Sequence, residues 1–352
     1  MPELPEVETV ARDLRGLVVG ARISGVRVNW LRTLRSGDPE AFATAVVGRT
    51  IVGTSRRAKL VVLDLDDGGA ITIHLKMTGQ LWVVPADQLE DSYTRLVLAF
   101  EDGRELRFRD IRKFGRVGIA RRDAAAGGDL RGELGGERGF KGFGPEPLDA
   151  AFTVRVFRRR IRDRRGRLKP LLLDQSFIAG IGNIYADEAL WAARLHPLRS
   201  AGSLRPADEG RLYRHIRSIL AEAVERRGSS VDDYTAPEGD GSMQERLLVY
   251  QRAGEHCSRC GHVIRRIVVG GRATHLCTWC QRLPAGERAA VATILAAMEP
   301  RPGRPTSGRR GPRWTDLEAG DGALGRRTER TRRAAATRRA AARDLATPSG
   351  AA

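Results

Sequence analysis

The chain has 352 residues, of which 41% are hydrophobic, and 61 Lys and Arg against 43 Asp and Glu give it a formal net charge of +18. This apolar fraction is too high for a fully disordered chain, and the absence of an apolar run of about 18 residues excludes a membrane-spanning helix. The length is typical of two domains with additional segments. The basic excess predicts a polyanionic partner, and nucleic acid is the simplest one.

The positive charge is almost entirely arginine, and part of it is concentrated at the C-terminus. Residues 301–352 hold 13 Arg and 5 acidic residues, so this low-complexity tail contributes a net +8 and residues 1–300 contribute +10. Because lysine is rare, each lysine is a candidate for a role that needs a compact or deprotonatable amine, although chance retention is the simpler alternative. The lysines are Lys59, Lys76, Lys113, Lys141 and Lys169.

The N-terminal part of the chain changes from helical to strand periodicity. Residues 5–18 are predicted to be helical, because Pro5 suits a first turn and apolar residues recur at the spacing of one helix face. Over residues 22–122 apolar and polar residues alternate, and Asp67-Gly68-Gly69 and Asp102-Gly103 are hairpin turn signals. These patterns predict a sandwich or barrel of antiparallel strands with a flanking helix.

A linker rich in glycine and charge follows, and residues 151–228 then return to helical periodicity. The polar loop after Gly228 is too long for a plain connector and is therefore a candidate functional segment. The predicted fold class is α+β. The predicted segments are a β-sandwich domain at 1–146, a hinge at 147–152, a helical domain at 153–250 with the loop 231–244, a four-cysteine module at 251–284 and a basic, mostly disordered tail at 285–352.

Four cysteines form two close pairs at a spacing typical of a structural metal site. Two tight turns place the thiolates around one tetrahedral ion, so we expect one structural Zn²⁺ rather than disulfides. The segment between the pairs predicts a hairpin that turns at Gly270-Gly271 and places Arg272 beside its tip. Four cysteines complete the coordination, so His256, His262 and His275 are expected to be bystanders. The ligands are Cys257, Cys260, Cys277 and Cys280.

The N-terminus is a candidate nucleophilic site. Removal of Met1 exposes the secondary amine of Pro2, and a terminal amine with a pKa of about 8 is partly unprotonated and able to attack an electrophilic carbon. Glu3 and Glu6 lie within one helical turn and are candidates for proton transfer. The alternative is an ordinary chain start in which both acids serve helix capping and the helix dipole.

Seven sequence blocks, taken in order, resemble the formamidopyrimidine-DNA glycosylase family in its bacterial zinc-finger form. The resemblance runs from residue 2 to about residue 282, and the order of the blocks makes it specific. The blocks are MPELPEVETV, RRAKL (56–60), HLKMTG (74–79), DIRKFG (110–115), GPEPLD (144–149), IAGIGNIYADEALWAARLHP (178–197) and the terminal four-cysteine finger.

The resemblance implies a bifunctional DNA glycosylase and AP lyase of base-excision repair that acts on oxidised purines, chiefly 8-oxoguanine and formamidopyrimidines. It assigns Pro2 to the attack on C1′ and Glu3 to acid and base catalysis. It assigns Lys59 to β-elimination and phosphate contact, and Arg272 to δ-elimination. The alternative for Lys59 is a solvated lysine on a strand, and the alternative for Arg272 is an ordinary surface arginine.

The resemblance also implies contacts around a nucleotide that leaves the DNA stack. Met77, Arg112 and Phe114 match a triad that fills the vacated space, and core packing is the alternative for the two apolar members. Arg112 and Phe114 lie two residues apart on a segment expected to be extended, so both side chains point the same way. Tyr93 stands where the family often has a His, and the loop 231–244 corresponds to a lid over the extruded base.

A glycine-rich turn that leads into a helix matches the family's helix-two-turn-helix element. We expect Asn183 to cap this helix and hold the backbone beside the lesion, with exposed amides at the helix start that favour a phosphate. Lys169 is expected to contact phosphate, and Glu188 to orient the amides of the turn. A plain helix cap and a solvated arginine face are the alternatives. The arginines expected near phosphate are Arg162, Arg164, Arg165 and Arg167, with Arg164 at a DNA-contact position of the family.

Two other interpretations compete with this one. An endonuclease VIII-like glycosylase has the same fold and nucleophile but prefers oxidised pyrimidines; the PEL start and the GPEPL segment favour the purine branch. A noncatalytic zinc-finger DNA-binding protein would use the basic charge alone. We expect a monomer that binds damaged double-stranded DNA, in the bacterial cytoplasm at the nucleoid and without a membrane.

Overall fold

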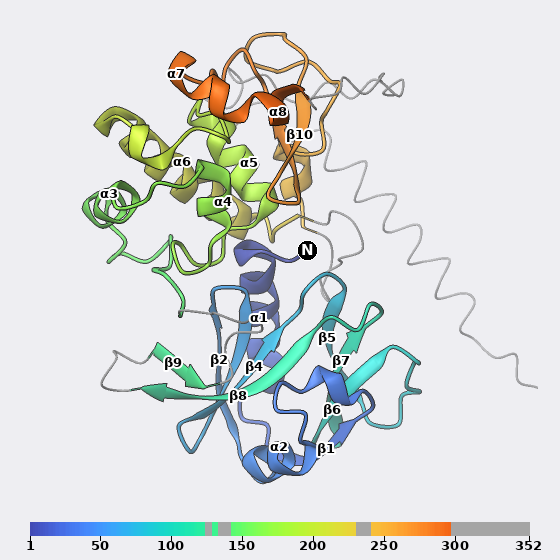
Figure 1. Cartoon of the computed structure of the whole chain (residues 1–352). Coiled ribbons are helices and arrows are strands. Elements are labelled where there is room, and N and C mark those ends of the chain that lie inside the picture. The colour runs from blue at the N-terminus through green and yellow to red at the C-terminus, as the bar shows by residue number, and fades with distance from the viewer. Residues whose placement is uncertain (124–128, 133–141, 230–240, 297–352) are drawn as a thin grey trace, which may run out of the picture. The chain divides into compact units, whose positions relative to one another are not determined.

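The N-terminal part of the computed structural model is an antiparallel β-sandwich (Figure 1). The structure describes residues 1–123, 129–132, 142–229 and 241–296. One sheet has the strand order β1-β6-β7-β5 and the other the order β2-β3-β4-β8-β9, so the predicted sandwich is confirmed. The strands are β1 (Ile23–Val28), β2 (Ile51–Arg57), β3 (Leu60–Leu65), β4 (Gly69–His74), β5 (Gly79–Pro85), β6 (Thr94–Phe100), β7 (Arg104–Asp110), β8 (Arg116–Asp123) and β9 (Asp129–Gly132).

Both predicted hairpin turns are present. Gly68 between β3 and β4 has a φ of +77°, and Gly103 between β6 and β7 has a φ of +81°. Glycine adopts these left-handed conformations without the clash that a Cβ would cause. Strands β3 and β4 then pair in register, with Leu63 opposite Ile71, and both of these side chains lie in the buried core of the sandwich.

Helix α1 (Leu4–Val18) contributes to two hydrophobic cores. Val7, Val10 and Leu14 lie on one face and pack into the core of the sandwich. Leu4, the first residue of the helix, packs into the core of the helical domain. The helix therefore connects the sandwich to the helical domain at the N-terminus of the chain.

A short helix, α2 (Pro39–Val46), was not predicted. The Asp38 side chain accepts hydrogen bonds of 3.0 Å from the amides of Glu40 and Ala41, and Pro39 occupies the first helical position. Asp followed by Pro is a helix-start signal. The signal was available in the sequence, but the strand alternation on both sides of it obscured it.

The helical region predicted after the linker is confirmed. Its α5 is buried from Ile184 to Ala192 on every side, as expected for a helix at the centre of a small domain. The helices are α3 (Val154–Arg162), α4 (Leu168–Leu173), α5 (Asn183–Ala192) and α6 (Pro206–Glu225). The short 3-10 helices are η1 (Leu31–Thr33), η3 (Ala201–Ser203), η4 (Met243–Arg246) and η5 (Ala289–Val291).

The cysteine module forms the predicted hairpin of β10 (Arg265–Val269) and β11 (Arg272–Leu276). Two short helices, α7 (Ala285–Arg288) and α8 (Ala292–Ala296), follow it, and Val291 packs against the hairpin core. Residues 285–296 of the predicted tail therefore hold short helices, and its remaining part, 297–352, lies outside the described residues. None of the described helices is long and apolar enough to cross a membrane.

Candidate active site

The carboxylate of Glu3 lies at the start of α5. Its Oε2 accepts a hydrogen bond of 2.8 Å from the amide of Gly182, and its Oε1 accepts one of 2.9 Å from the amide of Ile184. A Cβ on Gly182 would lie 2.3 Å from the Glu3 carboxyl carbon, so only glycine permits this approach. The amides that were predicted to bind a phosphate are therefore occupied by a side chain of the protein, and that prediction was wrong.

Pro2 and Glu3 are both buried, and Glu3 is only 1% exposed. Burial raises the pKa of Glu3 above its usual value; Lys59 and the amide of Ile184 oppose the shift, and Glu6 adds to it. A carboxyl group with a raised pKa retains its proton to a higher pH than an exposed one. Glu3 is thereby suited to proton transfer beside Pro2.

Glu6 holds the backbone of Glu3 in place. Its Oε2 accepts a hydrogen bond of 2.8 Å from the Glu3 amide, while its Oε1 accepts bonds from the hydroxyl of Tyr185 at 2.6 Å and the amide of Ser229 at 2.8 Å. The latter two residues belong to α5 and to the segment after α6. Glu6 therefore connects the first turn of α1 to the helical domain.

Lys59 lies in the turn between β2 and β3 and is 7% exposed. Burial lowers the pKa of its ammonium below the usual value; Glu3 and Glu6 oppose the shift, and the positive charge of Arg272 adds to it. The charges of Glu3 and Arg272 therefore both act on Lys59, and Glu3 directly follows Pro2 in the chain.

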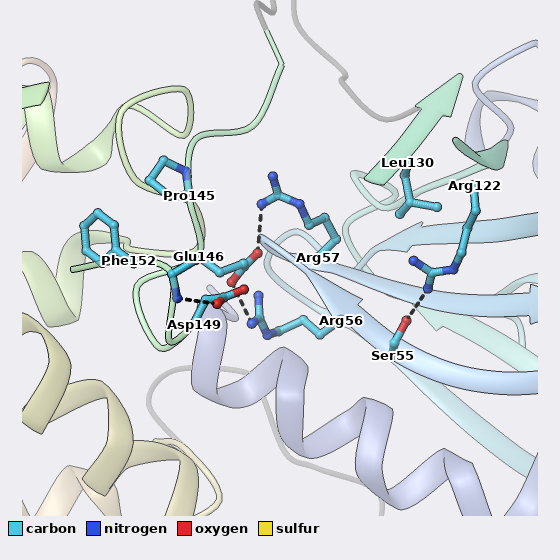
Figure 2. Close-up of a pocket in the computed structure, with 10 residues that line it drawn as sticks. Ser55, Arg56, Arg57, Arg122, Leu130, Pro145, Glu146, Asp149 and Phe152 are labelled. Carbon is cyan, nitrogen blue, oxygen red and sulfur yellow. Dashed lines mark hydrogen bonds and ion pairs between the residues drawn. The ribbon is translucent and has the colours of Figure 1, made fainter. Parts of the chain in front are cut away.

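Glu146 fixes the turn that carries Lys59 through its contacts with Arg56 and Arg57, which Figure 2 shows. Its carboxylate forms ion pairs of 2.7 Å with Arg56 and 2.9 Å with Arg57, and it accepts a hydrogen bond of 2.7 Å from the amide of Ala58. Burial opposes ionisation, but the two arginines outweigh it and hold the pKa of Glu146 below its usual value. Ala58 has a φ of +53°, and these contacts hold it in that unfavourable conformation.

Arg272 is exposed at the tip of the metal-binding hairpin. Gly270 and Gly271 have φ values of +56° and +74°, which a two-residue turn of this type requires at both positions. Arg272 pairs directly with Val269 across the turn. The predicted position of Arg272 beside the tip is confirmed.

Two predicted phosphate-binding residues instead hold the hairpin. The ammonium of Lys169, which is 0% exposed, donates hydrogen bonds of 2.6 Å to Asp187 and 2.9 Å to the carbonyl of Ala273. Asn183 donates one of 3.0 Å to the same carbonyl, and Gly182 is the N-cap residue of α5. The predicted phosphate contact of Lys169 and the predicted cap at Asn183 were therefore wrong, because buried protein groups occupy these side chains.

Asp110 joins the two turns that carry the predicted void-filling side chains. Its carboxylate accepts hydrogen bonds from Thr78, which follows Met77, and from the amide of Arg112 at 3.2 Å. Arg112 and Phe114 are exposed on a tight turn and not on the extended segment that was predicted. The guanidinium carbon of Arg112 lies 5.1 Å from the centroid of the Phe114 ring. Met77 is partly buried, so the structure leaves it accessible.

The other residues that were predicted to contact DNA are either exposed or paired with acidic side chains. Tyr93 is 40% exposed, and the guanidinium carbon of Arg109 lies 4.9 Å from the centroid of its ring. Arg164 is exposed, with its guanidinium carbon 6.0 Å from the centroid of Phe177. Of the neighbouring arginines, Arg162 forms an ion pair with Glu209 and Arg167 one with Glu287. In the predicted lid, residues 230–240 lie outside the described residues.

Glu188 does not orient the turn before α5, as had been predicted. Its carboxylate accepts hydrogen bonds from the amides of Leu248 at 3.0 Å, Val249 at 2.8 Å and Tyr250 at 2.8 Å. These residues lead into the metal-binding hairpin. Glu188 therefore ties that segment to α5, while Glu3 occupies the amides of the turn.

The four cysteine sulfurs lie within 4.8 Å of one another. Cys257 and Cys280 are 4.0 Å apart at their Sγ atoms, and Cys260 and Cys277 are 3.4 Å apart. Tetrahedral zinc with bonds of about 2.3 Å would separate its sulfur ligands by about 3.8 Å. The cluster therefore fits a tetrahedral metal ion. One nearby histidine, His262, has another partner, because its ring stacks on that of Trp279 with the two centroids 4.4 Å apart.

Three family models match successive parts of the chain. They are the formamidopyrimidine-DNA glycosylase N-terminal domain over residues 1–117, its H2TH domain over 143–235, and the zinc finger found in FPG and IleRS over 254–283. The chain belongs to the formamidopyrimidine-DNA glycosylase family. The predicted α+β fold, with its sandwich, helix-two-turn-helix domain and finger, is that of this family.

Relatives and solved structures agree with this assignment. The chain is 44% identical over 283 residues to the formamidopyrimidine-DNA glycosylase of Herpetosiphon aurantiacus and 45% identical over 284 residues to that of Roseiflexus sp., covering 80% of this chain and 100% of each relative. A complex of Lactococcus lactis Fpg with abasic-site DNA is similar at 34% identity and a TM-score of 0.71, over 80% of this chain and 100% of that one. A complex of the same protein with FAPY-dG-containing DNA has a TM-score of 0.70.

Sequence reasoning missed three buried or half-buried acids of this formamidopyrimidine-DNA glycosylase site: Asp110, Glu146 and Asp187. Two signals were present. Asp187 lies within a helix that is otherwise largely apolar, which indicates a buried polar group that needs a partner. Glu146 lies within GPEPLD, one of the blocks that resemble the family.

Proposed function

We propose that the protein is a bifunctional DNA glycosylase and AP lyase that removes oxidised purines, such as 8-oxoguanine and formamidopyrimidines, through a Schiff base on Pro2. The observation that carries the proposal is the burial of Glu3 beside Pro2, together with Lys59, a buried lysine on which the charges of Glu3 and Arg272 both act. Solved complexes of a similar protein contain abasic-site DNA and FAPY-dG-containing DNA, which supports the substrate class.

The nucleophile is the amine of Pro2. Met1 precedes Pro2 in the chain, so the nitrogen is an amide until Met1 is removed. The free amine attacks C1′ as the bond from C1′ to the base breaks; the base leaves with the electron pair and takes the proton that the attacking nitrogen loses. The C1′–O4′ bond then breaks to give an iminium on Pro2, and Glu3, whose pKa is raised, donates the proton that O4′ takes.

The iminium makes strand cleavage possible without a redox cofactor. It acidifies the C2′ proton; loss of that proton forms the C2′=C3′ bond and expels the 3′ phosphate. Loss of the C4′ proton then forms the C4′=C5′ bond and expels the 5′ phosphate. Lys59 and Arg272 act in the first and second steps respectively, by balancing the negative charge of the departing phosphate.

The remaining assignments follow from exposure and chemistry. Met77, Arg112 and Phe114 fill the space that the extruded nucleotide leaves, and Tyr93 and Arg164 contact the DNA backbone. The metal is one structural Zn²⁺, which fits four thiolates with no open position. A single chain supplies every candidate group, so the protein acts as a monomer.

Trapping with borohydride tests the proposal. The protein without Met1 is incubated with an 8-oxoguanine:C duplex, and reduction of the iminium yields a covalent adduct. We expect the adduct to be strongly reduced in Pro2→Gly and in a chain that retains Met1. No adduct with any damaged duplex would exclude a Schiff-base enzyme. A preference for a thymine-glycol duplex would instead indicate the endonuclease VIII-like branch.

A further inference from the structure

A buried ion pair connects helices α4 and α5 to the finger strand β11. Asp187 and Lys169 are each 0% exposed, and the Asp187 Oδ1 accepts a hydrogen bond of 2.6 Å from the Lys169 ammonium. The other carboxylate oxygen accepts one of 2.8 Å from the backbone amide of His275 and lies 3.2 Å from its Nδ1. Lys169 of α4 and Asp187 of α5 therefore both contact strand β11.

These contacts hold the backbone of β11 next to Arg272. Ala273 directly follows Arg272, and its carbonyl accepts hydrogen bonds from Lys169 at 2.9 Å and Asn183 at 3.0 Å. His275, two residues further on, is held by Asp187. The strand cannot slide or rotate against α5 without breaking several buried hydrogen bonds, and such bonds are costly to leave unmade.

The metal centre alone does not fix the tip of the hairpin. Cys277 is five positions from Arg272, and an extended strand advances about 3.3 Å per residue, so the two lie roughly 16 Å apart along β11. A rotation of about 10° at the cysteines would therefore displace Arg272 by roughly 3 Å at the end of this length. The contacts of Asp187 and Lys169 lie between these two points.

We propose that Asp187 is a positioning residue for Arg272. Its carboxylate, with Lys169 as its counter-charge, locks β11 in the register that presents the exposed guanidinium of Arg272 to the reacting strand. The inference rests on the proposed function, in which Arg272 acts in δ-elimination. Asp187 itself is buried and touches neither substrate nor reacting atoms.

The test is the full-length Asp187→Asn variant on an abasic-site duplex under single-turnover conditions. Borohydride trapping reports the Schiff base, and the cleaved ends report the two eliminations: an unsaturated aldehyde after β-elimination alone, and a 3′-phosphate after both. We expect unchanged trapping, DNA affinity and zinc content, but δ-elimination slowed about 10- to 100-fold by misplacement of Arg272. Asp208→Asn is the matched control, because Asp208 is a buried carboxylate of α6 that pairs with Arg199 and Arg211 instead.

Arg272→Ala separates the inference from the proposed function. If Arg272→Ala leaves the product ratio unchanged, the assigned role of Arg272 fails, and the inference with it. If Arg272→Ala accumulates the aldehyde product and Asp187→Asn does not, only the positioning role is overturned.

A second variant covers the case in which Asp187→Asn loses zinc. Combining it with Lys169→Met removes both buried charges, so that no unpaired charge destabilises the fold. The aldehyde product should still accumulate in this double variant. A normal product ratio, or zinc loss here as well, would overturn the proposal, because the cluster would then serve folding alone.

Discussion

Glu3, the residue before α1, accepts a hydrogen bond of 2.9 Å from the amide of Ile184, the second residue of α5. The contact places a catalytic candidate of the N-terminal domain on the positive end of a helix in the other domain. The helix end stabilises the carboxylate, while burial favours the protonated acid, and burial is the larger effect because the pKa of Glu3 is raised. The same contact thus positions the group and leaves it able to carry a proton.

Glu3→Gln should therefore lower catalysis more than binding. Glutamine has nearly the same shape and still accepts one amide hydrogen bond, but it cannot transfer a proton. We expect the single-turnover rate of 8-oxoguanine excision to fall about 100-fold or more. Affinity for a duplex with a non-cleavable abasic analogue should change little. A rate near that of the unchanged protein would show that Glu3 serves only to join the two domains.

The sequence predicted those features that depend on neighbouring residues. Helix 5–18, the glycine hairpin turns and the finger with Arg272 at its tip all follow from periodicity, turn chemistry and cysteine spacing. The same local logic identified a helix start near Asn183. It failed to identify what binds there, since the partner, Glu3, lies 181 positions before Ile184 in the sequence.

Lys169 shows the same limit. Its position among arginines predicted an exposed phosphate contact, yet the side chain turns inward to a carboxylate on the next helix. Whether a lysine faces solvent or an ion pair depends on tertiary packing, which local pattern does not contain. A buried acid in a helix that is largely apolar, such as Asp187, is the better sequence signal for such a pair.

Glu146→Gln should slow strand cleavage at an abasic site. The change removes the charge that pairs with Arg56 and Arg57, so the Ala58 turn loosens and Lys59 loses its fixed position. We expect single-turnover β-elimination to fall about 10-fold, as for a small misplacement of a catalytic group. Asp149→Asn is the control, because Asp149 and Glu146 line one cavity of about 350 Å³, while the Asp149 carboxylate accepts a hydrogen bond from the nearby amide of Ala151. Equal effects of both variants would contradict a specific role for Glu146.

His196 should lower the free energy of unfolding as the pH falls into the acidic range. Burial lowers the pKa of His196 to about 4, against the pull of Glu287, and its Nδ1 accepts a hydrogen bond of 3.1 Å from the amide of Leu198. The unfolded chain takes up the proton near pH 6.5 and the folded chain only near pH 4. Between these values the free energy of unfolding falls as the pH falls, by about 3 kcal/mol in total.

His196→Asn tests this dependence, because an amide oxygen can accept the same hydrogen bond without titrating. Urea unfolding of both proteins is measured at intervals from pH 4 to pH 7. The difference in stability between them should shift in favour of the variant as the pH falls. A constant difference across the range would mean that His196 is protonated in the folded state as easily as in the unfolded one.

Cys277→Ser should lose the metal and most of the DNA affinity while the sandwich stays folded. In zinc-finger peptides the metal contributes about 10–16 kcal/mol to folding, so a finger with three thiolates is expected to unfold. Metal content, duplex affinity and the circular dichroism of the strands are measured together. A metal-free protein that binds DNA as tightly as the intact one would refute a role for the finger in binding.

Two truncations should separate the basic tail from the finger. Deletion of 301–352 removes a net charge of +8 and should lower the salt dependence of nonspecific DNA binding, by about 7 in the log–log slope when this net charge neutralises as many phosphates, without loss of excision. Deletion of 285–352 also removes Val291, which packs against the hairpin, and Glu287, which accepts a hydrogen bond of 2.7 Å from the amide of Ser200. The longer deletion should therefore lower finger stability and excision together. If the shorter deletion alone abolishes excision, the catalytic unit extends beyond residue 300.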